Sequence, residues 1–299
     1  MPDRLLRLPL APAAPAAHQG VAASAIGRLA VRSLYREVAL APKPGLVSPV
    51  DSGSHGDMDF RTFLRSLSAL RFYFPSIAAW GAGEPEFSEL QRLGIAAEAR
   101  MLAATGGINT HRGAIFNLGL LCAAAGALAA AGTPLSATGA CRLVQERWGA
   151  GILAGLARPA AGPCSHGLVV ARRYGSGGAR QEAADGFPAA REIGLPAYRA
   201  ALVAGASHDE AAVQALFALV AEVEDTNLLW RGGLDGLRYG QRAAADFLAA
   251  GGVENPDWRP RAEAVHREFV RRRLSPGGSA DLLGVTLFLD ALDNTPPCA

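Results

Sequence analysis

Apolar residues recur at the three- to four-residue spacing of an α-helix along almost the whole chain, whereas the alternating pattern of a β-strand is scarce. The sequence shows no repeat period and no linker that would divide it. We therefore predict an all-α fold, a single-domain helical bundle at residues 21–299 that follows a flexible tail at residues 1–20. The polar motifs fall between the predicted helices, so the functional site is expected in the interhelical loops.

Proline, glycine and capping residues set the predicted helix boundaries. We expect helices at Val21–Ala41, from Asp57 or Asp59 to a disturbance at Pro75, at Pro85–Ala104, over an Ala-rich stretch ending at Ala131, and at Ser136–Leu156, Ala189–Ala204, Asp209–Glu224, Leu234–Ala250, Trp258–Arg273 and Ala280–Leu292. The segment Arg158–Pro188 is rich in glycine and proline and poorly periodic, which indicates a long functional loop or short irregular turns.

Charge and composition exclude several classes of protein. The net charge of +2 leaves no cationic surplus for coating a nucleic acid, and the four cysteines show no CxxC spacing for zinc or a disulfide framework, so a cytoplasmic location is expected. The apolar stretch Leu118–Gly132 is shorter than the about 20 residues of a membrane span and is expected to be a buried, closely packed helix. Pro9, Pro12 and Pro15 oppose a signal peptide. Neither nucleic acid nor membrane is expected as a partner.

Two charged residues near the start of the chain are candidate site residues. Lys43 is the only lysine among 29 basic residues, and it lies in the stiff turn PKPGLV. Such a turn can hold an ammonium group for phosphate oxygens, although an exposed loop lysine is the alternative. Glu37 falls in the middle of the apolar face of the first predicted helix, where a carboxylate is costly unless it is paired or protonated. It is either a catalytic group or half of a structural salt bridge with an arginine.

The motif SGSHGDMD places His55, Asp57 and Asp59 within five residues after a flexible run. Two carboxylates at the start of a helix can hold Mg²⁺ through their oxygens and link it to phosphates. The alternative is that they only cap the helix and favour its dipole. His55 is either a proton donor or a solvated loop histidine.

The motif TGGINTHRG combines a glycine pair with a cap predicted at Thr110 and with His111 and Arg112 in the first turn of the next helix. Free backbone N–H groups at a helix start beside Arg112 make an anion site, although the residue order of a Walker P-loop is absent. A capped turn between two helices is the alternative, but it leaves Asn109, His111 and Arg112 together unexplained.

Three further motifs place polar groups at predicted junctions. SPGGSADLLG predicts Ser279 as a cap and Asp281 in the first turn, GARQEAADGFP places Arg180 and Glu182 in a loop, and DTNLLWRGG places Asp225, Asn227 and Arg231 at a helix end. Each motif is weak alone. Together they indicate an enzyme that handles a polyphosphate rather than a scaffold.

Taken in order along the chain, PKPGLV, SGSHGDMD, TGGINTHRGAIF with the LGLL after it, GARQEAADGFP, DTNLLWRGG and SPGGSADLL resemble the triphosphoribosyl-dephospho-CoA synthase family, which serves citrate lyase and malonate decarboxylase. The resemblance runs from about Glu37 to Leu292. Arg112 departs from the family pattern, which often has lysine there, so the charge is kept without a lysine-specific role.

The resemblance implies an all-helical, cytoplasmic enzyme that takes ATP and 3′-dephospho-CoA and releases adenine. Its product would be 2′-(5″-triphosphoribosyl)-3′-dephospho-CoA, the precursor of the prosthetic group on an acyl carrier subunit. From the overall character of the sequence we favour the malonate decarboxylase pathway over that of citrate lyase. A carrier-protein transferase of the same pathway is the protein partner expected.

The motifs and the resemblance together define the candidate site. Its catalytic candidates are Glu37, Asp57, Asp59 and His55. Its substrate-binding candidates are Lys43, Gly45, Asn109, Thr110, His111, Arg112, Arg180, Glu182, Asp225, Asn227, Arg231, Ser279 and Asp281. The expected cofactor is Mg²⁺, with Asp57, Asp59 and Asp225 as its candidate ligands.

The implied reaction breaks the N-glycosidic bond of ATP and keeps its triphosphate, so its transition state has oxocarbenium character. It requires a base for the 2′-hydroxyl of dephospho-CoA, an acid or hydrogen bond for the departing adenine, and exclusion of water. Two alternatives use the same residues. One is an all-α, Mg²⁺-dependent hydrolase of a nucleotide or N-glycoside, and the other is a helical adaptor that binds a nucleotide or a carrier protein without turnover.

Overall fold

The computed structural model describes residues 17–157, 169–170 and 173–295, and these ranges contain helices and no strand. The predicted all-α fold is confirmed. Up to residue 16, the predicted tail lies outside the described residues. The helices of the first half are α1 (Ala17–Ala39), α2 (Phe60–Leu70), α3 (Tyr73–Gly81), α4 (Phe87–Thr105), α5 (Arg112–Ala130), α6 (Ala137–Leu143), the π-turn η1 (Val144–Trp148) and α7 (Gly149–Ala157). Those of the second half are α9 (Gly178–Ala184), the π-turn η2 (Ala190–Gly194), α10 (Leu195–Val203), α11 (His208–Glu222), α12 (Thr226–Ala249), the 3₁₀ turn η3 (Gly252–Glu254), α13 (Trp258–Arg271) and α14 (Gly277–Asp293).

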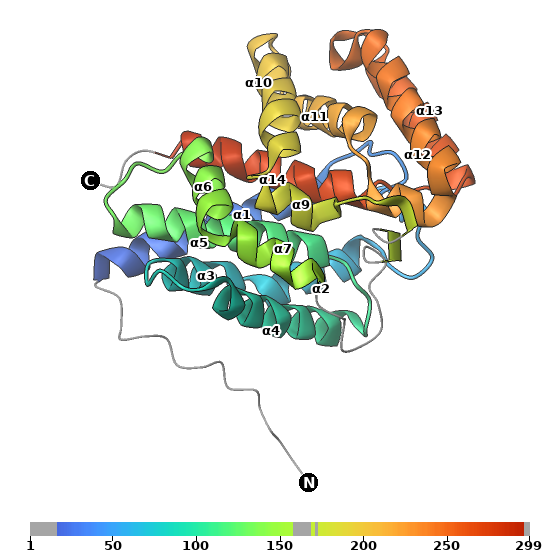
Figure 1. Ribbon diagram of the computed structural model, residues 1–299. Helices are drawn as coiled ribbons and strands as arrows, with labels where there is room; N and C mark the ends of the chain where they lie inside the picture. The colour runs from blue at the N-terminus through green and yellow to red at the C-terminus, as the bar shows by residue number, and fades with distance from the viewer. Residues whose placement is uncertain (1–16, 158–168, 171–172, 296–299) are drawn as a thin grey trace.

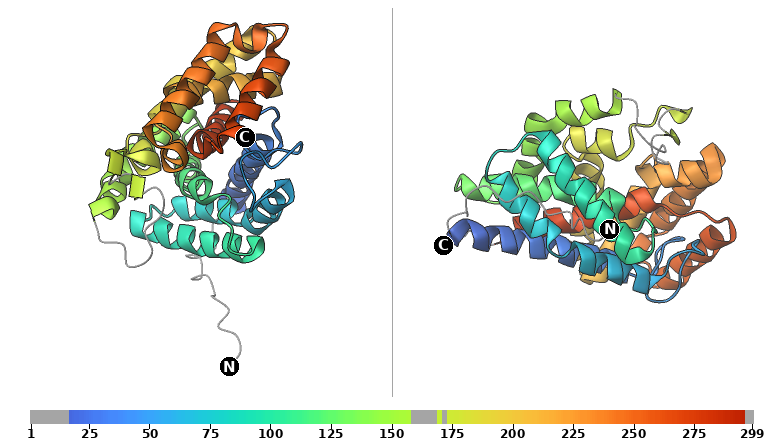
Figure 2. Two further views of the ribbon diagram at one scale, coloured as in Figure 1. Left: turned by 90° about the vertical axis from the view of Figure 1, so that its right-hand side faces the viewer. Right: turned by 90° about the horizontal axis from the view of Figure 1, so that it is seen from below.

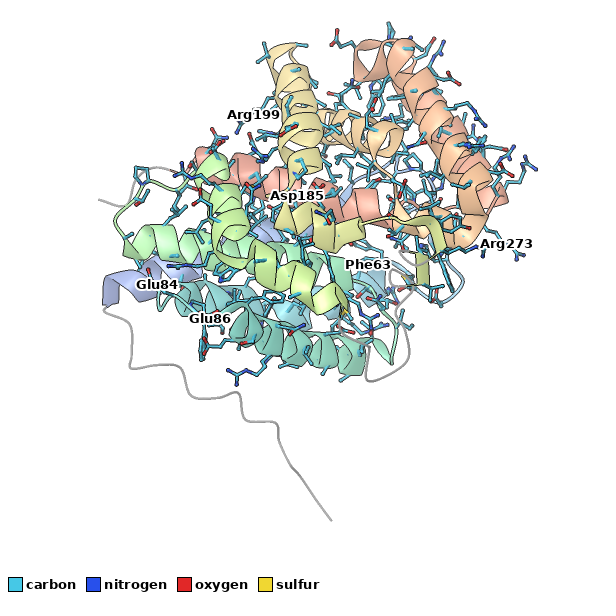
Figure 3. The ribbon with its side chains drawn as sticks, viewed as in Figure 1. Phe63, Glu84, Glu86, Asp185, Arg199 and Arg273 are labelled. Atoms are coloured by element: carbon cyan, nitrogen blue, oxygen red, sulfur yellow. The ribbon has the colours of Figure 1, made fainter. Side chains whose placement is uncertain are left out.

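Helix α14 lies between two groups of helices (Figure 1). It packs on α1 and α5 on one side and on α10, α11 and α12 on the other. The left-hand view of Figure 2 shows the same separation, with α12 and α13 on the far side of α14 from α3 and α4. Arg199 of α10, labelled in Figure 3, pairs with Asp290 at 2.9 Å and with Asp293 at 2.8 Å, and so ties the second group to α14.

Helix α5 is the centre of the first group, and small residues let its backbone approach that of α3. A Cβ at Gly126 would overlap the carbonyl of Ala78, and one at Gly81 would overlap the carbonyl of Ala123. Glycine is therefore required at both positions, because any side chain would push the two helices apart. The prediction that Leu118–Gly132 is a closely packed buried helix is confirmed.

Helix α5 is also long and apolar enough to cross a membrane by length and composition alone. In this structure 67% of its most apolar window is buried inside the protein. Its apolar side chains are therefore accounted for by contacts with α1, α3, α4 and α14.

Two predicted helix boundaries are wrong for reasons of backbone geometry. The helix expected to be disturbed at Pro75 already ends at Leu70, and Pro75 lies in the first turn of α3, where its missing N–H group is not needed. The helix expected to start at Leu234 begins eight residues earlier, at Thr226. It runs on past Gly233, although the φ of 60° and ψ of −159° at this residue are not helical. The pair Gly232-Gly233 is a kink inside α12 rather than a stop.

The segment GARQEAADGFP is also not the loop that its composition predicts. Gly178–Ala184 forms the short helix α9, and the next helical stretch begins with the π-turn η2 and continues into α10. Helix Ser136–Leu156 likewise exists as α6 and α7 joined by the π-turn η1, with Ser136 as the cap that accepts a bond from the Gly139 N–H.

Candidate active site

One cavity of about 1390 Å³ gathers the polar motifs. Helices α5, α12 and α14 all begin at this cavity, and α1 with the loop after it, α2, α3, α4 and α9 also contribute to its wall. Phe63 of α2 and Asp185 at the end of α9, both labelled in Figure 3, are among the residues that line it. Each of the six motifs contributes lining residues, so segments distant in sequence meet here.

Most of the predicted site residues line this cavity. They are Glu37, Lys43, His55, Asp57, Asn109, Thr110, His111, Arg112, Arg180, Glu182, Asp225, Asn227, Arg231 and Asp281. Gly45, Asp59 and Ser279 are not among the lining residues.

Lys43 and Glu37 form a buried ion pair in the cavity wall. Lys43 Nζ lies 2.7 Å from Glu37 Oε1, and it also donates to the Glu37 carbonyl at 2.7 Å. The Glu37 carbonyl lies in the last turn of α1, where it also accepts the Leu40 N–H at 3.3 Å, and this helix end favours a cation. Lys43 is 1% exposed and Glu37 is 6% exposed, so the alternative of an exposed loop lysine is wrong. The salt bridge foreseen for Glu37 exists, but its partner is Lys43 and not an arginine.

His55 lies near the cavity mouth in a fixed network. Arg231 Nη2 donates to His55 Nδ1 at 3.1 Å, and because an arginine only donates, this nitrogen carries no proton. The proton is then on Nε2, which donates to Ser275 Oγ at 2.9 Å. Burial and the charge of Arg231 lower the pKa of His55 to about 4. His55 is thus neutral at pH 7, and Asp57, 3.8 Å away, remains largely exposed.

Arg231 is anchored by backbone as well as by His55. Its Nη1 donates to the carbonyls of Ser54 at 3.1 Å and Arg273 at 3.2 Å. This side chain therefore joins the start of α12 to the loop before α2 and to the residues after α13.

Asp59 caps α2, which is the alternative role that its position at a helix start allowed. Its Oδ1 accepts bonds from the backbone N–H of Thr62 at 2.8 Å and from the Thr62 hydroxyl at 2.7 Å. These bonds from Thr62 lower the pKa of Asp59.

Gly45 has a φ of 62°, and a Cβ there would overlap the Leu274 carbonyl, so it serves a tight turn.

Asp225 holds two helix starts together. Its Oδ1 accepts from the N–H groups of Asn227 at 2.8 Å and Leu228 at 3.2 Å, and its Oδ2 accepts from the N–H of Ser279 at 2.7 Å and its hydroxyl at 2.9 Å. Burial raises the pKa of Asp225, while these donors oppose the rise. The motif DTNLLWRGG therefore lies at a helix start and not at a helix end. Ser279 is not the cap of α14, because α14 begins two residues earlier, at Gly277.

The start of α5 is not the open anion site that its sequence suggests. The N-cap residue of α5 is His111, which makes no side-chain cap bond, so the cap predicted at Thr110 is wrong by one residue; the Arg112 N–H is accepted by Asn109 Oδ1 at 3.1 Å. The carboxylate of Asp281 lies against Gly113, where a Cβ would overlap it, and accepts a bond from the Ala114 backbone. Burial, with the charges of Glu37 and Asp225, raises the pKa of Asp281 well above its usual range.

His111 is buried beside this helix start. Its Nδ1 lies 2.6 Å from Ser66 Oγ, and its ring meets Phe63 edge-on at 5.0 Å. Burial, and then the charge of Lys43, lowers the pKa of His111 to about 3, so the ring is neutral. Arg112, by contrast, is exposed and paired through Nε with Glu98 Oε1 at 2.6 Å.

Helix α9 carries an acidic and a basic lining residue, Glu182 and Arg180, whose surroundings differ. Glu182 Oε1 accepts the N–H groups of Ala189 at 2.8 Å and Ala190 at 3.3 Å, and so caps the helical stretch that follows. Burial raises the pKa of Glu182. Arg180 makes no hydrogen bond or ion pair with any described residue, so its guanidinium is the lining cation most available to a ligand.

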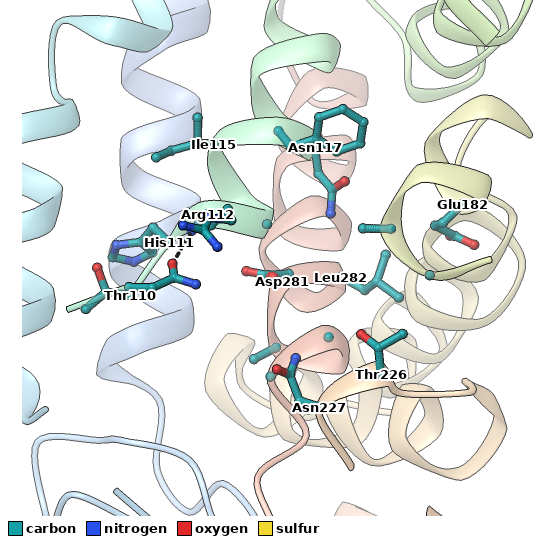
Figure 4. Close-up of a pocket in the computed structure, with 18 of the residues that line it drawn as sticks. Thr110, His111, Arg112, Ile115, Asn117, Glu182, Thr226, Asn227, Asp281 and Leu282 are labelled. Atoms are coloured by element: carbon teal, nitrogen blue, oxygen red, sulfur yellow. Dashed lines mark hydrogen bonds between the residues drawn. The ribbon is translucent and has the colours of Figure 1, made fainter. Parts of the chain in front are cut away.

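Among the lining residues that sequence reasoning missed is Asn117 of α5. Its Oδ1 is buried and has no hydrogen-bond partner among the described residues, as is also true of Thr110 Oγ1 and His111 Nε2. Figure 4 shows the Asn117 amide pointing into the cavity. The signal was present, because Asn117 is a polar residue within an apolar helix, the same pattern that singles out Glu37.

Carboxylates outnumber cations in the cavity wall. The lining acids are Glu37, Asp57, Glu98, Glu182, Asp185, Glu224, Asp225 and Asp281, against Lys43, Arg112, Arg180 and Arg231. Within the described part of the chain, no group of three or more potential ligands is placed to hold a metal ion.

The family model and the curated relatives that match this chain indicate the same family. A family model described as ATP:dephospho-CoA triphosphoribosyl transferase matches residues 23–297. A probable 2-(5″-triphosphoribosyl)-3′-dephosphocoenzyme-A synthase of Acinetobacter calcoaceticus is 46% identical over 87% of this chain and 88% of its own length. Proteins with the same description from Stutzerimonas stutzeri (strain A1501) and Vibrio cholerae serotype O1 (strain M66-2) are 43% and 40% identical, covering 91% and 87% of this chain and 92% and 86% of their own lengths. No solved structure matches.

Proposed function

The chain belongs to the ATP:dephospho-CoA triphosphoribosyl transferase family, and from this premise we propose how its cavity carries out the transfer. As a member it is a transferase. In the reaction, the bond between C1′ of the ATP ribose and N9 of adenine breaks, and a bond from C1′ to the 2′-oxygen of dephospho-CoA forms. The 2′-hydroxyl loses its proton, and adenine leaves with the N9 electron pair and takes up a proton.

The observation that carries this proposal is the convergence of all six motifs on one cavity. A transfer between two nucleotides needs room for both, and the cavity of about 1390 Å³ is larger than the roughly 300–1,000 Å³ of a typical small-molecule site. Apolar side chains such as Phe63, Phe87 and Leu282 lie among the polar groups and exclude water. Exclusion of water favours transfer over hydrolysis of ATP.

Glu37 and Asp281 are the proposed proton-transfer pair. Glu37 is a buried carboxylate in the cavity wall, held in place by its ion pair with Lys43, and such a group suits a base for the 2′-hydroxyl or a partner of the oxocarbenium charge. The pKa of Asp281 is raised, which suits a group that donates a proton to the departing adenine. Two neighbouring carboxylates in different environments can thus divide the acid and base roles. The network that keeps His55 neutral favours these carboxylates over His55.

The phosphates are proposed to lie toward the cationic side chains of the wall. Arg180 has no partner among the described residues and is proposed as the first contact of the triphosphate. Arg112 and Arg231 already hold Glu98 and backbone carbonyls, so a phosphate would share them. Asn227 lies at the start of α12, where its amide can add a hydrogen bond.

We also propose that Mg²⁺ enters bound to the triphosphate. The excess of lining carboxylates and the lack of a complete metal site among the described residues both favour an ion that brings phosphate oxygens with it. Asp57 is the proposed protein ligand, because its side chain is 64% exposed and free to turn toward a phosphate. Asp225 is a poorer ligand, since both its oxygens already accept hydrogen bonds. Mg²⁺ would neutralise phosphate charge.

The reaction is tested by mass spectrometry of the purified protein with ATP, Mg²⁺ and 3′-dephospho-CoA. Adenine that appears together with a triphosphoribosyl adduct of dephospho-CoA supports the transfer. Adenine and a free sugar triphosphate without an adduct would instead make the protein a hydrolase. ATP that stays intact in a bound state would favour a non-catalytic binding protein.

We further propose that the product serves malonate decarboxylase rather than citrate lyase, and that the protein acts in the cytoplasm beside a carrier-protein transferase of that pathway. The pathway proposal rests on the overall character of the sequence. The buried thiols of Cys122 and Cys141 are free, which suits a reducing compartment. Restoration of growth on malonate, and not on citrate, in strains lacking each synthase would test the pathway.

A further inference from the structure

Asn117 is an isolated amide in the most apolar helix of the protein. From Ala114 to the end of α5 it is the only residue with a strongly polar side chain, and it is 1% exposed. Its Oδ1 is buried and has no hydrogen-bond partner among the described residues. A buried amide without partners destabilises a folded protein. Its presence is explained if a ligand supplies the missing partners.

The side chain is aimed at the space that such a ligand would fill. Asn117 lines the cavity, and Figure 4 shows its amide directed into the gap between α5, α9 and α14, on the side of Leu282. Phe116, Leu120 and Leu282 line the same cavity and give the amide apolar neighbours. A group that binds here is therefore largely apolar and carries a hydrogen-bonding edge.

Asn117 lies deeper along α5 than Arg112, the cation of this helix that lines the cavity. Asn117 lies five residues beyond Arg112 on α5, and at about 1.5 Å per residue this places it about 7.5 Å further along the helix axis. No cation lies on α5 beyond Arg112, so α5 offers nothing there to a phosphate. Of the parts of the two substrates, a purine base fits a flat apolar space with one polar edge.

We propose that Asn117 binds the adenine of ATP, with its carbonyl accepting from the N6 amino group and its amide donating to N7. This two-bond pairing is the one by which asparagine recognises adenine in nucleic acids. Hypoxanthine presents two acceptors, O6 and N7, along the same edge, so it loses one bond. Asn117 thus selects ATP over a 6-oxo purine nucleotide, and its bond to N7 withdraws electron density from the base as N9 departs. The inference rests on the proposed function for the identity of the substrate.

The experiment compares the wild-type protein with N117A and N117L on ATP, ITP and 7-deaza-ATP, which has a C–H in place of N7. Binding is measured by calorimetry, and release of the base is measured with dephospho-CoA as kcat/KM. For the wild type we expect a preference for ATP over ITP of about 10- to 100-fold, falling to about threefold or less in both variants. In the wild type, 7-deaza-ATP should bind more weakly and react with a lower kcat/KM than ATP, and this difference should be smaller in both variants. Thr286→Val is the matched control, because Thr286 is a buried polar residue of α14 outside the cavity wall.

A stability measurement separates recognition from a structural role. N117L removes an unpaired buried amide, so we expect its Tm to equal or exceed that of the wild type. A lowered Tm with an unchanged preference for ATP would make Asn117 structural and overturn the inference. An unchanged preference with an unchanged Tm would overturn it as well.

The binding measurements keep this inference distinct from the proposed reaction. If the wild type binds ATP over ITP, and N117A loses that preference, adenine recognition stands even if no base is released. If adenine is released but N117A prefers ATP over ITP as strongly as the wild type does, the proposed reaction is supported and the proposed role of Asn117 is refuted.

Discussion

Replacement of Lys43 by methionine leaves the carboxylate of Glu37 buried without a counter-charge. In the wild type the two groups are 2.7 Å apart, and Glu37 is 6% exposed, so water cannot replace the ammonium group. Removal of one partner from a buried ion pair costs about 3–5 kcal/mol. At about 2–4 °C of Tm per kcal/mol for a chain of roughly this size, K43M should lower the Tm by roughly 6–20 °C.

The loss of stability in K43M should depend on pH, and the direction of this dependence follows from the burial of Glu37. Without Lys43, burial raises the pKa of Glu37 in the folded state above its value in the unfolded chain. A group with a raised folded pKa destabilises the protein progressively as the pH rises through that pKa, and not below the unfolded value of about 4.3. The Tm deficit of K43M relative to the wild type should therefore be larger at pH 8 than at pH 5.

The assay is thermal unfolding followed by circular dichroism at both pH values, with K43M, E37Q and the double variant E37Q/K43M. Because E37Q removes the charge that K43M leaves unpaired, the double variant should be more stable than K43M alone. A Tm for K43M equal to that of the wild type at pH 8 would refute the reasoning. A double variant less stable than K43M would refute it too, since the cost would then not come from the charge of Glu37.

Three further perturbations have expected outcomes. G113A should push the Asp281 carboxylate from its place and lower adenine release at least about tenfold, whereas G284A, where a Cβ meets only an ordinary contact, should leave it unchanged in the same assay. D225N should place an NH₂ group against at least one N–H donor and lower the free energy of unfolding in urea by about 2–4 kcal/mol, while a loss under about 0.5 kcal/mol would contradict the double-capping role of Asp225 with Ser279. Chelation of Mg²⁺ with EDTA should abolish adenine release, and added Mg²⁺ should restore it; release that persists in EDTA would remove Mg²⁺ from the proposal.

Local patterns predicted the helices and several site residues because those features depend on neighbours in sequence. The 3.6-residue period exposed Glu37 as a charge on an apolar face, and the structure gives it a buried partner. The same period placed Asn117 inside α5 but could not show that its amide meets a cavity. Asp59 and Asp57 look equivalent in sequence, and only the position of Thr62 after the helix start commits Asp59 to a cap.

Residues whose role depends on distant segments could not be assigned from the sequence. The backbone N–H groups at the start of α5 are available to an anion when the motif is considered alone. In the structure Asn109 accepts the N–H of Arg112, and Asp281, from the other end of the chain, accepts a bond from the Ala114 backbone. Asp225 looks like a free carboxylate until α14 brings Ser279 beside it. Gly232 and Gly233 look like a helix stop, because a glycine pair in sequence does not reveal that the helix resumes beyond them.

The contact between α3 and α5 holds one wall of the cavity in place. At Gly81 and Gly126 the two backbones touch directly, so α5 cannot slide or roll without collision. The wall that carries Asn117 and His111 is therefore rigid. The opposite wall carries Arg231 on the short first segment of α12, which joins the rest of that helix through the non-helical backbone of Gly233. Asp225 accepts the Ser279 N–H and Arg231 donates to the Ser54 and Arg273 carbonyls, so this short segment is held to α14 and to the loop before α2 independently of the rest of α12.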